Sequence, residues 1–277
     1  MSSQPYQPLA EVFGFPVHNT SATATDYRSR RLCPFNNKAP ECTKDRLEDP
    51  LGVCSVYESG RPVITCPIRF RQDWAILEHA ARFFFTPGTT WHPLEETRIE
   101  DADGLPAGNI DFVLASVSEG GQVLNFGALE VQAVYISGNV RRPFASYIED
   151  NARFLREGWS RTSVRPDYLS SSRKRLAPQL LYKGSILKSW GKRMAVALQN
   201  RFFETLPSLP EVNPDQADIA WLIYDLVDDP ANRVYNLKLE QTVYTAFSPA
   251  LERITVPQPG SLSSFVELLQ RKLYGQV

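Results

Sequence analysis

The chain has 277 residues, of which 43% are hydrophobic and 22% charged, and its 30 Lys and Arg residues nearly balance 31 Asp and Glu residues. This composition excludes disordered, fibrous and disulfide-scaffold proteins, and no apolar run approaches the roughly 18–20 residues that a membrane span requires. The first residues lack the basic and apolar regions of a signal peptide, so we expect a cytoplasmic protein with reduced cysteines.

The first part of the chain, up to about residue 65, is rich in Pro, Asn, Ser and Thr and lacks strong hydrophobic periodicity. All the cysteines of the chain lie in or directly after it, at Cys33, Cys42, Cys54 and Cys66. Four thiolates brought together by short loops can enclose one tetrahedral zinc or iron ion. The spacing is not the usual C-x₂-C pair, and two disulfides or four separate core thiols are the alternatives. The clustering favours a closed structural metal site.

The rest of the chain predicts a mixture of helices and strands. Apolar spacing predicts a helix over residues 71–85, and two apolar, β-rich runs predict strands over residues 109–117 and 123–136, joined by a hairpin at Gly120-Gly121. Further on we expect helices near 145–157 and 180–203, strands at 219–227 and 234–247, and a final helix at 262–274. This order favours an α/β fold with a mixed central sheet. We expect residues 1–70 to form a small loop-rich metal-binding segment and residues 71–277 the core.

Polar residues interrupt the two apolar strands. Asp111 begins the first strand, and Glu130 and Gln132 share one face of the second because strand side chains alternate. A carboxylate in so apolar a strand is costly unless it binds a partner or a cation. Asp111 and Glu130 could converge on Mg²⁺, which accepts phosphate oxygens and acidifies water for phosphodiester hydrolysis. An Asp followed by Glu-x-Gln has the order of the PD-(D/E)xK nuclease site, with Gln where Lys is usual. Polar residues of an edge strand are the alternative.

Charge is distributed unevenly along the chain. Between Gly138 and Thr205 there are fourteen Lys and Arg residues against five Asp and Glu residues. Such a surplus is typical of a surface that faces a polyanion, and the alternative is a set of solvated helices with basic outer faces. Candidates for phosphate contacts are Arg141, Arg142, Arg173, Lys174, Arg175, Lys192 and Arg193.

Several short motifs occur together and in order: CPF at 33–35, Cys42, GVCSV at 52–56, TCPIRF at 65–70, DFVLASV at 111–117 and GALEVQ at 127–132. Together they resemble the NotI-like restriction endonucleases over roughly residues 12–138. The resemblance implies a PD-(D/E)xK core whose catalytic set is Asp111, Glu130 and Gln132. It also implies that the four cysteines bind structural iron, with zinc as the alternative. A further family glutamate falls on Glu96, with Glu95 and Glu100 close enough to compete.

The resemblance also implies a function. We expect a type II-like, Mg²⁺-dependent endonuclease of a prokaryotic cytoplasm, which hydrolyses double-stranded DNA at a palindromic, GC-rich site. A palindromic target implies a homodimer, because protein symmetry mirrors that of the site. A cognate DNA methyltransferase would protect the host, and no membrane is involved. The alternative is a catalytically silent DNA-binding or scaffold protein that keeps the fold and the iron site. Retention of Asp111, Glu130 and Gln132 together favours the enzyme.

Overall fold

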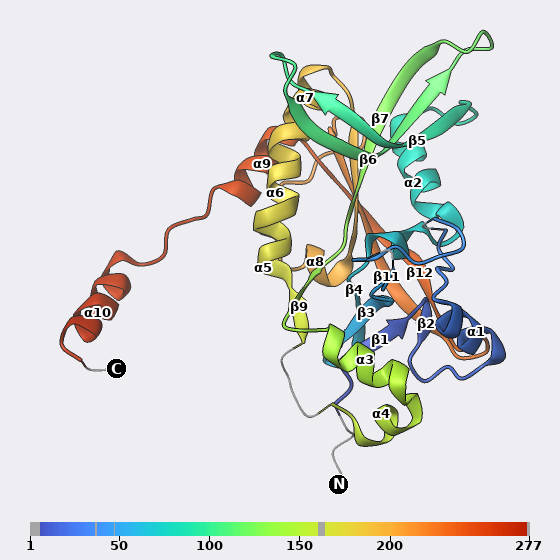
Figure 1. The fold of residues 1–277 in the computed structure, drawn as a ribbon. Helices are drawn as coiled ribbons and strands as arrows, with labels where there is room; N and C mark the ends of the chain where they lie inside the picture. The colour runs from blue at the N-terminus through green and yellow to red at the C-terminus, as the bar shows by residue number, and fades with distance from the viewer. Residues whose placement is uncertain (1–5, 37, 47, 160–163, 276–277) are drawn as a thin grey trace.

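The computed structural model describes residues 6–36, 38–46, 48–159 and 164–275. Its centre is a six-stranded mixed sheet in the order β12-β11-β10-β7-β6-β5 (Figure 1). The strands are β5 (Trp91–Glu100), β6 (Pro106–Val117), β7 (Val123–Gln132), β10 (Met194–Gln199), β11 (Ile219–Asp229) and β12 (Val234–Thr245). β10 runs parallel to both β7 and β11, and the other neighbours are antiparallel. A mixed sheet confirms the predicted α/β class.

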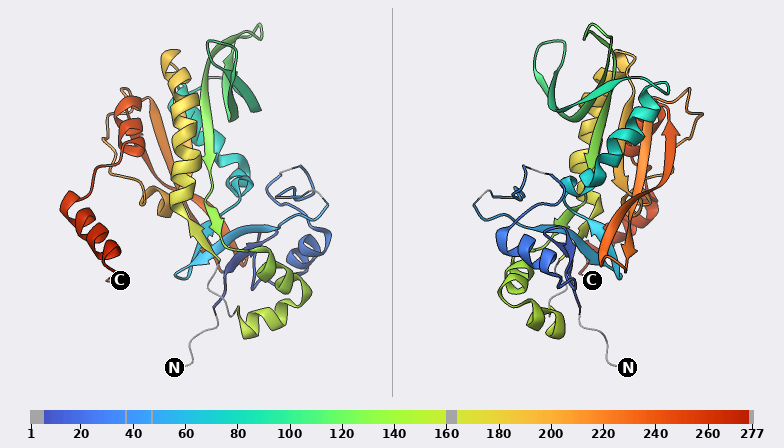
Figure 2. Two further views of the ribbon diagram at one scale, coloured as in Figure 1. Left: turned by 60° about the vertical axis from the view of Figure 1, so that its left-hand side comes forward. Right: turned by 90° about the vertical axis from the view of Figure 1, so that its right-hand side faces the viewer.

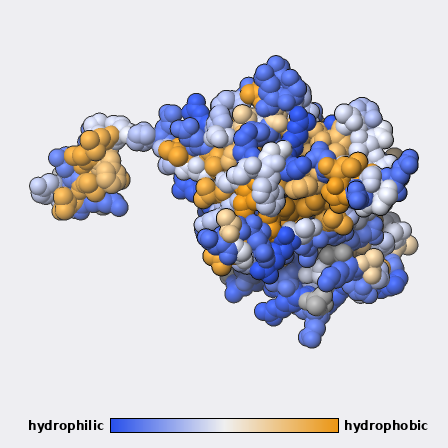
Figure 3. All heavy atoms as spheres, turned by 90° about the horizontal axis from the view of Figure 1, so that it is seen from above, coloured by the Kyte–Doolittle hydropathy of each residue, from blue (hydrophilic) through white to orange (hydrophobic). Residues whose placement is uncertain are grey.

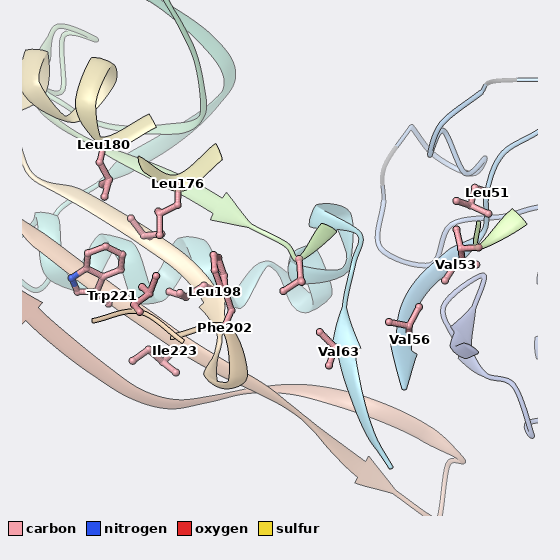
Figure 4. Packing of buried hydrophobic residues seen from close by; sticks show 14 of the residues in the cluster. Leu51, Val53, Val56, Val63, Leu176, Leu180, Leu198, Phe202, Trp221 and Ile223 are labelled. Atoms are coloured by element: carbon pink, nitrogen blue, oxygen red, sulfur yellow. The ribbon is translucent and has the colours of Figure 1, made fainter. Parts of the chain in front are cut away.

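Helices cover both faces of this sheet (Figures 1 and 2). On one face, α2 (Ala75–Phe84) packs apolar residues that include Ile76 and Phe84 against the strands. On the other face lies a segmented helix, residues 168–189, in which α-helical pieces alternate with the π-helical turns η2 and η3. Its pieces are α5 (Tyr168–Ser171), η2 (Ser172–Leu176), α6 (Ala177–Gln179), η3 (Leu180–Gly184) and α7 (Ser185–Ser189). Figure 4 shows Leu176 and Leu180 of this helix close to Trp221 of β11.

A second lobe contains a four-stranded antiparallel sheet in the order β2-β1-β3-β4. Its strands are β1 (Leu9–Val12), β2 (Phe15–Pro16), β3 (Val53–Glu58) and β4 (Arg61–Ile64), with α1 (Ala22–Arg30) in the same part of the chain. The helices α3 (Arg141–Glu149) and α4 (Asn151–Glu157) return to this lobe, where the Tyr147 hydroxyl donates to the Val17 carbonyl at 2.8 Å. β8 (Tyr135–Ser137) and β9 (Arg165–Asp167) pair where the chain leaves and re-enters the core. The lobe therefore draws on two separate stretches of sequence.

The C-terminal part of the described chain lies apart from the core. α8 (Asn200–Phe203) and α9 (Phe247–Thr255) pack on the body, whereas α10 (Leu262–Leu273) is separated from it by an extended linker (Figures 1 and 3). The apolar side chains of α10 are exposed to solvent. In the described part of the chain, no helix has the length and apolar character needed to cross a membrane.

Several predicted elements are confirmed, and one is wrong. β6, β11, β12 and α10 form where the periodicity predicted them, and the Ser118 N–H donates to the Gln122 carbonyl in the predicted hairpin. The helix predicted over residues 180–203 is wrong beyond Ser189. Gly191 has a φ of +66°, which ends the helix, and Met194–Gln199 form β10 in the middle of the sheet. A short apolar run bordered by parallel strands is buried on both faces, so its sequence does not alternate and cannot be told from a helix.

Other differences are local. The helix predicted from residue 71 begins at Ala75, because η1 (Pro67–Trp74) ends in two residues, Asp73 and Trp74, with left-handed backbone. The strand predicted over 123–136 is interrupted after Gln132, and the helix near 145–157 is divided at Asp150, whose carboxylate caps α4. β1 to β5 were not predicted. The first four are short, and β5 is a polar edge strand, so neither carries a strong hydrophobic period.

Candidate active site

Three of the predicted acidic residues lie in one row across adjacent strands. Phe112 of β6 pairs with Leu129 of β7, so the neighbouring residues Asp111 and Glu130 face each other across these strands. On the other side of β6, Glu96 of β5 lies opposite Asp111, between two paired positions of the ladder. Two consecutive antiparallel pairings therefore bring together side chains that are well separated in the sequence.

Glu130 is the most deeply buried member of this row, with 0% of its surface exposed. It lies on the sheet face that the segmented helix covers, and its Oε1 is 2.6 Å from Nζ of Lys183. Apart from Lys183 and the facing Asp111 carboxyl, neither Glu130 oxygen has a partner among the residues that the structure describes. Burial raises the pKa of Glu130 to about 8, with a further rise from the Asp111 charge that Lys183 opposes. Glu130 is thus a carboxyl that binds a proton or a cation.

Asp111 is only partly buried and lies beside Glu130. Its Oδ2 accepts a hydrogen bond of 2.8 Å from the Val131 backbone N–H. Burial raises the pKa of Asp111, while the Val131 N–H and the Lys183 charge act in the opposite direction. The site therefore places two facing carboxyl groups beside one ammonium group.

Gln132 follows Glu130 on the same face of β7 and is 2% exposed. Its Nε2 donates to the Ala133 carbonyl at 2.8 Å. Its Oε1 is buried and accepts no hydrogen bond from any described residue. This oxygen and those of Glu130 can therefore accept a hydrogen bond or bind a cation.

The three glutamates of β5 differ in their surroundings. Glu95 forms an ion pair with Arg71 at 3.1 Å, and Glu100 forms one with Arg98 at 3.2 Å. Glu96 is exposed, has a φ of +48° and makes no hydrogen bond or ion pair with a described residue. Its place in the row and its available carboxylate favour Glu96 over its two neighbours. A left-handed backbone at a non-glycine residue is costly and is concentrated at functional sites.

The donor atoms of this row suit a hard divalent cation. Carboxylate and amide oxygens are ligands that Mg²⁺ accepts, and the ion retains several water molecules when protein ligands are few. Across the residues that the structure describes, no three His, Cys, Asp or Glu side chains are arranged as a metal-holding group. Asp111 and Glu130 therefore offer a partial ligand set, which leaves coordination positions for water and for a substrate oxygen.

Lys183 is a site residue that the sequence analysis missed. It is 4% exposed and lies in η3, where its Nζ also donates to the Asn109 carbonyl at 2.8 Å. Leu176, Leu180 and Leu187 lie on the same buried stripe of the segmented helix. A lysine at helical spacing within an apolar stripe was the available signal, because lysine is almost never fully buried without a partner.

The four cysteines line one small cavity of about 10 Å³ and none is in a disulfide, all four being in the described part of the chain. Burial raises the pKa of Cys42 to about 11 and that of Cys54 well above its usual value, with neighbouring thiols adding to both shifts. Four sulfur donors have the composition of a tetrahedral metal site. The described residues nevertheless contain no group arranged to hold a metal ion, so the structure does not show the predicted iron site.

Three of the predicted phosphate-binding residues are engaged in contacts within the chain. Arg141 forms ion pairs of 2.6 and 2.9 Å with Asp45 and Asp49. Lys192 donates to Asn125 Oδ1 at 2.7 Å. Arg193 donates to the carbonyls of Phe83 and Asp215, at 2.7 and 3.3 Å. These side chains connect loops, and contact with DNA stays a prediction for them.

The remaining basic candidates are open to solvent. Arg142 on α3 and Arg173 and Lys174 on η2 are exposed. Arg175 is exposed too, but it stacks on the Tyr135 ring at 4.5 Å and donates to the Tyr135 hydroxyl. The structure thus distributes the seven candidates over α3, the first half of the segmented helix and the turn before β10.

A comparison with protein families gives one match. The family described as Restriction endonuclease NotI matches residues 12–237. The matched region contains all four cysteines, the acidic row, Gln132 and the seven basic candidates. A search of curated proteins finds no match.

Proposed function

This chain belongs to the restriction endonuclease NotI family, and from that premise we propose that it hydrolyses double-stranded DNA at a specific site with Mg²⁺ as cofactor. Family membership makes the chain a DNA endonuclease and hence a hydrolase. The observation that carries the Mg²⁺ proposal is the buried Glu130, which faces Asp111 and has no further hydrogen-bond partner among the described residues. Two facing carboxylates carry more negative charge than the single Lys183 ammonium balances, and a divalent cation would neutralise the rest.

The roles of the residues follow from their positions. Hydrolysis forms a bond from a water oxygen to phosphorus and breaks one phosphorus–ester bond; the water loses a proton to solvent and the leaving oxygen gains one. Asp111 and Glu130 would hold Mg²⁺, which neutralises phosphate charge and lowers the pKa of water when bound. The unpartnered Oε1 of Gln132 can accept a hydrogen bond from the attacking water and orient it. Glu96 is the fourth candidate, at the exposed end of the row.

The proposal extends to the partners of the chain. A palindromic, GC-rich duplex would be bound by a homodimer, because two symmetric half-sites require two copies. Arg142, Arg173 and Lys174 are exposed and are the best placed of the basic candidates to contact phosphates. A cognate DNA methyltransferase with the same sequence specificity would protect the host genome from cleavage.

We also propose that the four cysteines bind one structural metal ion, iron rather than zinc. Two observations support this: the four thiols line one cavity, and burial disfavours the charged forms of Cys42 and Cys54 unless a cation is present. Binding requires the surrounding loops to draw the sulfur atoms closer together. Metal analysis of the purified protein should find close to one equivalent of iron; a protein with neither iron nor zinc would contradict this part of the proposal.

The decisive experiment is cleavage of a mixed plasmid substrate. Wild-type protein with Mg²⁺ should produce discrete fragments, and a chelator should abolish them. Glu130→Ala should give no cleavage yet still bind DNA, whereas Glu119→Ala, an exposed turn residue, should cleave normally. Cleavage by Glu130→Ala at the wild-type rate would overturn the assignment. A folded wild-type protein that binds DNA but cuts no substrate would favour the silent DNA-binding alternative.

A further inference from the structure

Lys183 is buried beside the candidate active site. Its side chain is 5% exposed, and its Nζ lies 2.6 Å from Glu130 Oε1 and 2.8 Å from the Asn109 carbonyl oxygen. Burial of an ammonium group is costly unless opposite charge compensates for it. Here Glu130 and the facing Asp111 provide that charge. The ammonium therefore belongs to the same electrostatic unit as the two carboxyl groups.

The segmented helix fixes Lys183 in this place. Lys183 lies in the π-helical turn η3, between Leu180 and Leu187 on the buried stripe. The next residue, Gly184, allows close contact with α9, because a Cβ there would be 2.6 Å from the Phe247 ring. π-Helical turns are rare and occur frequently at functional sites. The helix thus holds this lysine over β6 and β7.

β7 itself carries no positive charge at the site. Gln132, two residues after Glu130, is a neutral amide, and its Nε2 is already used by the Ala133 carbonyl. Phosphodiester hydrolysis increases the negative charge on the phosphate oxygens in the transition state. Preorganised positive groups stabilise such charge far better in a buried site than in water. Lys183 supplies that charge from a different element of the fold.

A purely structural ion pair would have a different environment. Structural pairs in protein interiors are stable when further hydrogen bonds satisfy their remaining atoms. Beyond Lys183 and Asp111, the described residues offer the Glu130 oxygens no hydrogen-bond partner, although the pair is almost fully buried. The two charges of the pair therefore compensate each other, but the Glu130 oxygens can still accept a further hydrogen bond. This is expected of a site that binds a substrate.

We propose that Lys183 is a catalytic residue whose ammonium group contacts the scissile phosphate and the attacking water, and that it supplies the positive charge that Gln132 cannot. This inference rests on the proposed endonuclease function. Lys183 forms no covalent bond and retains its protons; it acts only by donating hydrogen bonds to oxygen atoms that become more negative. In the chain without DNA, the same group compensates Glu130.

The test compares lysines on one helix. Lys183→Met should lower the single-turnover cleavage rate about a hundredfold or more, the range for a lost electrostatic donor. DNA binding measured without cleavage, in Ca²⁺, should stay within about threefold. Lys188→Met is the matched control: Lys188 lies on α7 and pairs with Asp218 at the surface, so cleavage should be unchanged.

A second variant separates chemistry from folding. In Lys183→Met/Gln132→Lys the positive charge moves to β7, and we expect this double variant to cleave DNA at least tenfold faster than Lys183→Met. Calorimetric Mg²⁺ binding, which does not depend on turnover, should be no weaker in Lys183→Met than in wild type. If Lys183→Met does not fold, Lys183→Gln replaces it, since the amide keeps a donor for the Asn109 carbonyl without a charge.

Each outcome decides. If Lys183→Met cleaves DNA at a rate within threefold of wild type, this inference is wrong. It is also wrong if Lys183→Met loses Mg²⁺ and DNA binding to the same extent as it loses cleavage and Gln132→Lys does not restore the rate. If Glu130→Ala is inactive while Lys183→Met is active, only the role of Lys183 fails. If Glu130→Ala is active, the proposed function itself fails.

Discussion

Two fully buried glutamates of this chain, Glu11 in the small lobe and Glu130 in the core, each face one cation. Arg69 Nε lies 3.0 and 3.1 Å from the two carboxylate oxygens of Glu11, and the Ser55 hydroxyl donates to one of them at 2.7 Å. Glu130 has the ion pair with Lys183 and the facing Asp111 carboxyl, and no other described residue donates a hydrogen bond to its oxygens.

The cation of the first pair is equally well satisfied. Arg69 also donates to Gln72 Oε1 at 2.8 Å and to the Tyr235 carbonyl at 2.7 Å, and it stacks on the Phe35 ring at 4.3 Å. These contacts join the small lobe to β12. Burial of charge therefore does not by itself indicate function. The difference lies in the remaining hydrogen-bonding capacity: the Glu11–Arg69 pair has used it within the chain, whereas Glu130 can still bind a further ligand.

The largest expected effect tests this difference between Glu11 and Glu130 directly. Glu130→Gln should lower single-turnover cleavage by more than about a thousandfold, because an amide cannot replace a metal-binding carboxylate. Its loss of melting temperature should be the smaller one, because Asp111 still compensates the Lys183 charge. Glu11→Gln should do the reverse: an unpaired Arg69 costs about 3–5 kcal/mol and lowers the melting temperature by on the order of 10 °C. Thermal unfolding and cleavage at low temperature measure both. Equal destabilisation by the two variants would contradict the distinction.

The second effect concerns two buried glutamines. Gln199 is satisfied, since Oε1 accepts from the Ile64 N–H and Nε2 donates to the Pro62 carbonyl and to Asp225. Gln132 has an unpartnered Oε1. Gln132→Ala should lower the cleavage rate roughly ten- to a thousandfold without loss of stability, the range for a positioning group. Gln199→Ala should lower the melting temperature and leave cleavage at low temperature intact. A Gln132→Ala enzyme with the wild-type rate would remove Gln132 from the catalytic set.

The third effect is the pH dependence of Mg²⁺ binding. Since burial raises the pKa of Glu130 in the metal-free protein to about 8, a proton competes with a cation for this carboxyl below that pH. Mg²⁺ affinity should therefore rise by up to about tenfold per pH unit toward pH 8 and then level off. Calorimetric titration at pH 6.5, 7.5 and 8.5 measures this. In Glu130→Gln the dependence should disappear; a flat profile in the wild type would count against Glu130 as a ligand.

The smallest effect concerns the exposed basic residues. Arg173→Ala and Lys174→Ala, tested singly, should weaken DNA binding severalfold for all sequences and reduce the salt slope by about one. Arg30→Ala, which removes an exposed arginine paired with Asp26 on α1, is the control and should change neither. Filter binding at several salt concentrations gives both quantities. An unchanged slope for both variants would identify this part of the helix as a solvated face.

The sequence by itself determined the parts of this protein that depend on local pattern. Alternation and apolar content predicted β6 and the hairpin to β7, and they placed Asp111, Glu130 and Gln132 on adjacent strands. The order of the motifs identified the family before any contact was known. Local sequence is sufficient for these because apolar, β-branched runs on both sides of a Gly-rich turn favour a hairpin of two strands.

Only the tertiary structure decided which residues complete the site. Residues 194–199 became a strand because β7 and β11 pair with them on both sides. Strand register placed Glu96, rather than Glu95, opposite Asp111. Packing of the segmented helix brought Lys183 to Glu130 and gave the Glu130 oxygens no other described partner besides Asp111. Whether a buried polar atom has a hydrogen-bond partner depends on segments that are distant in the sequence, so the local sequence pattern cannot predict it.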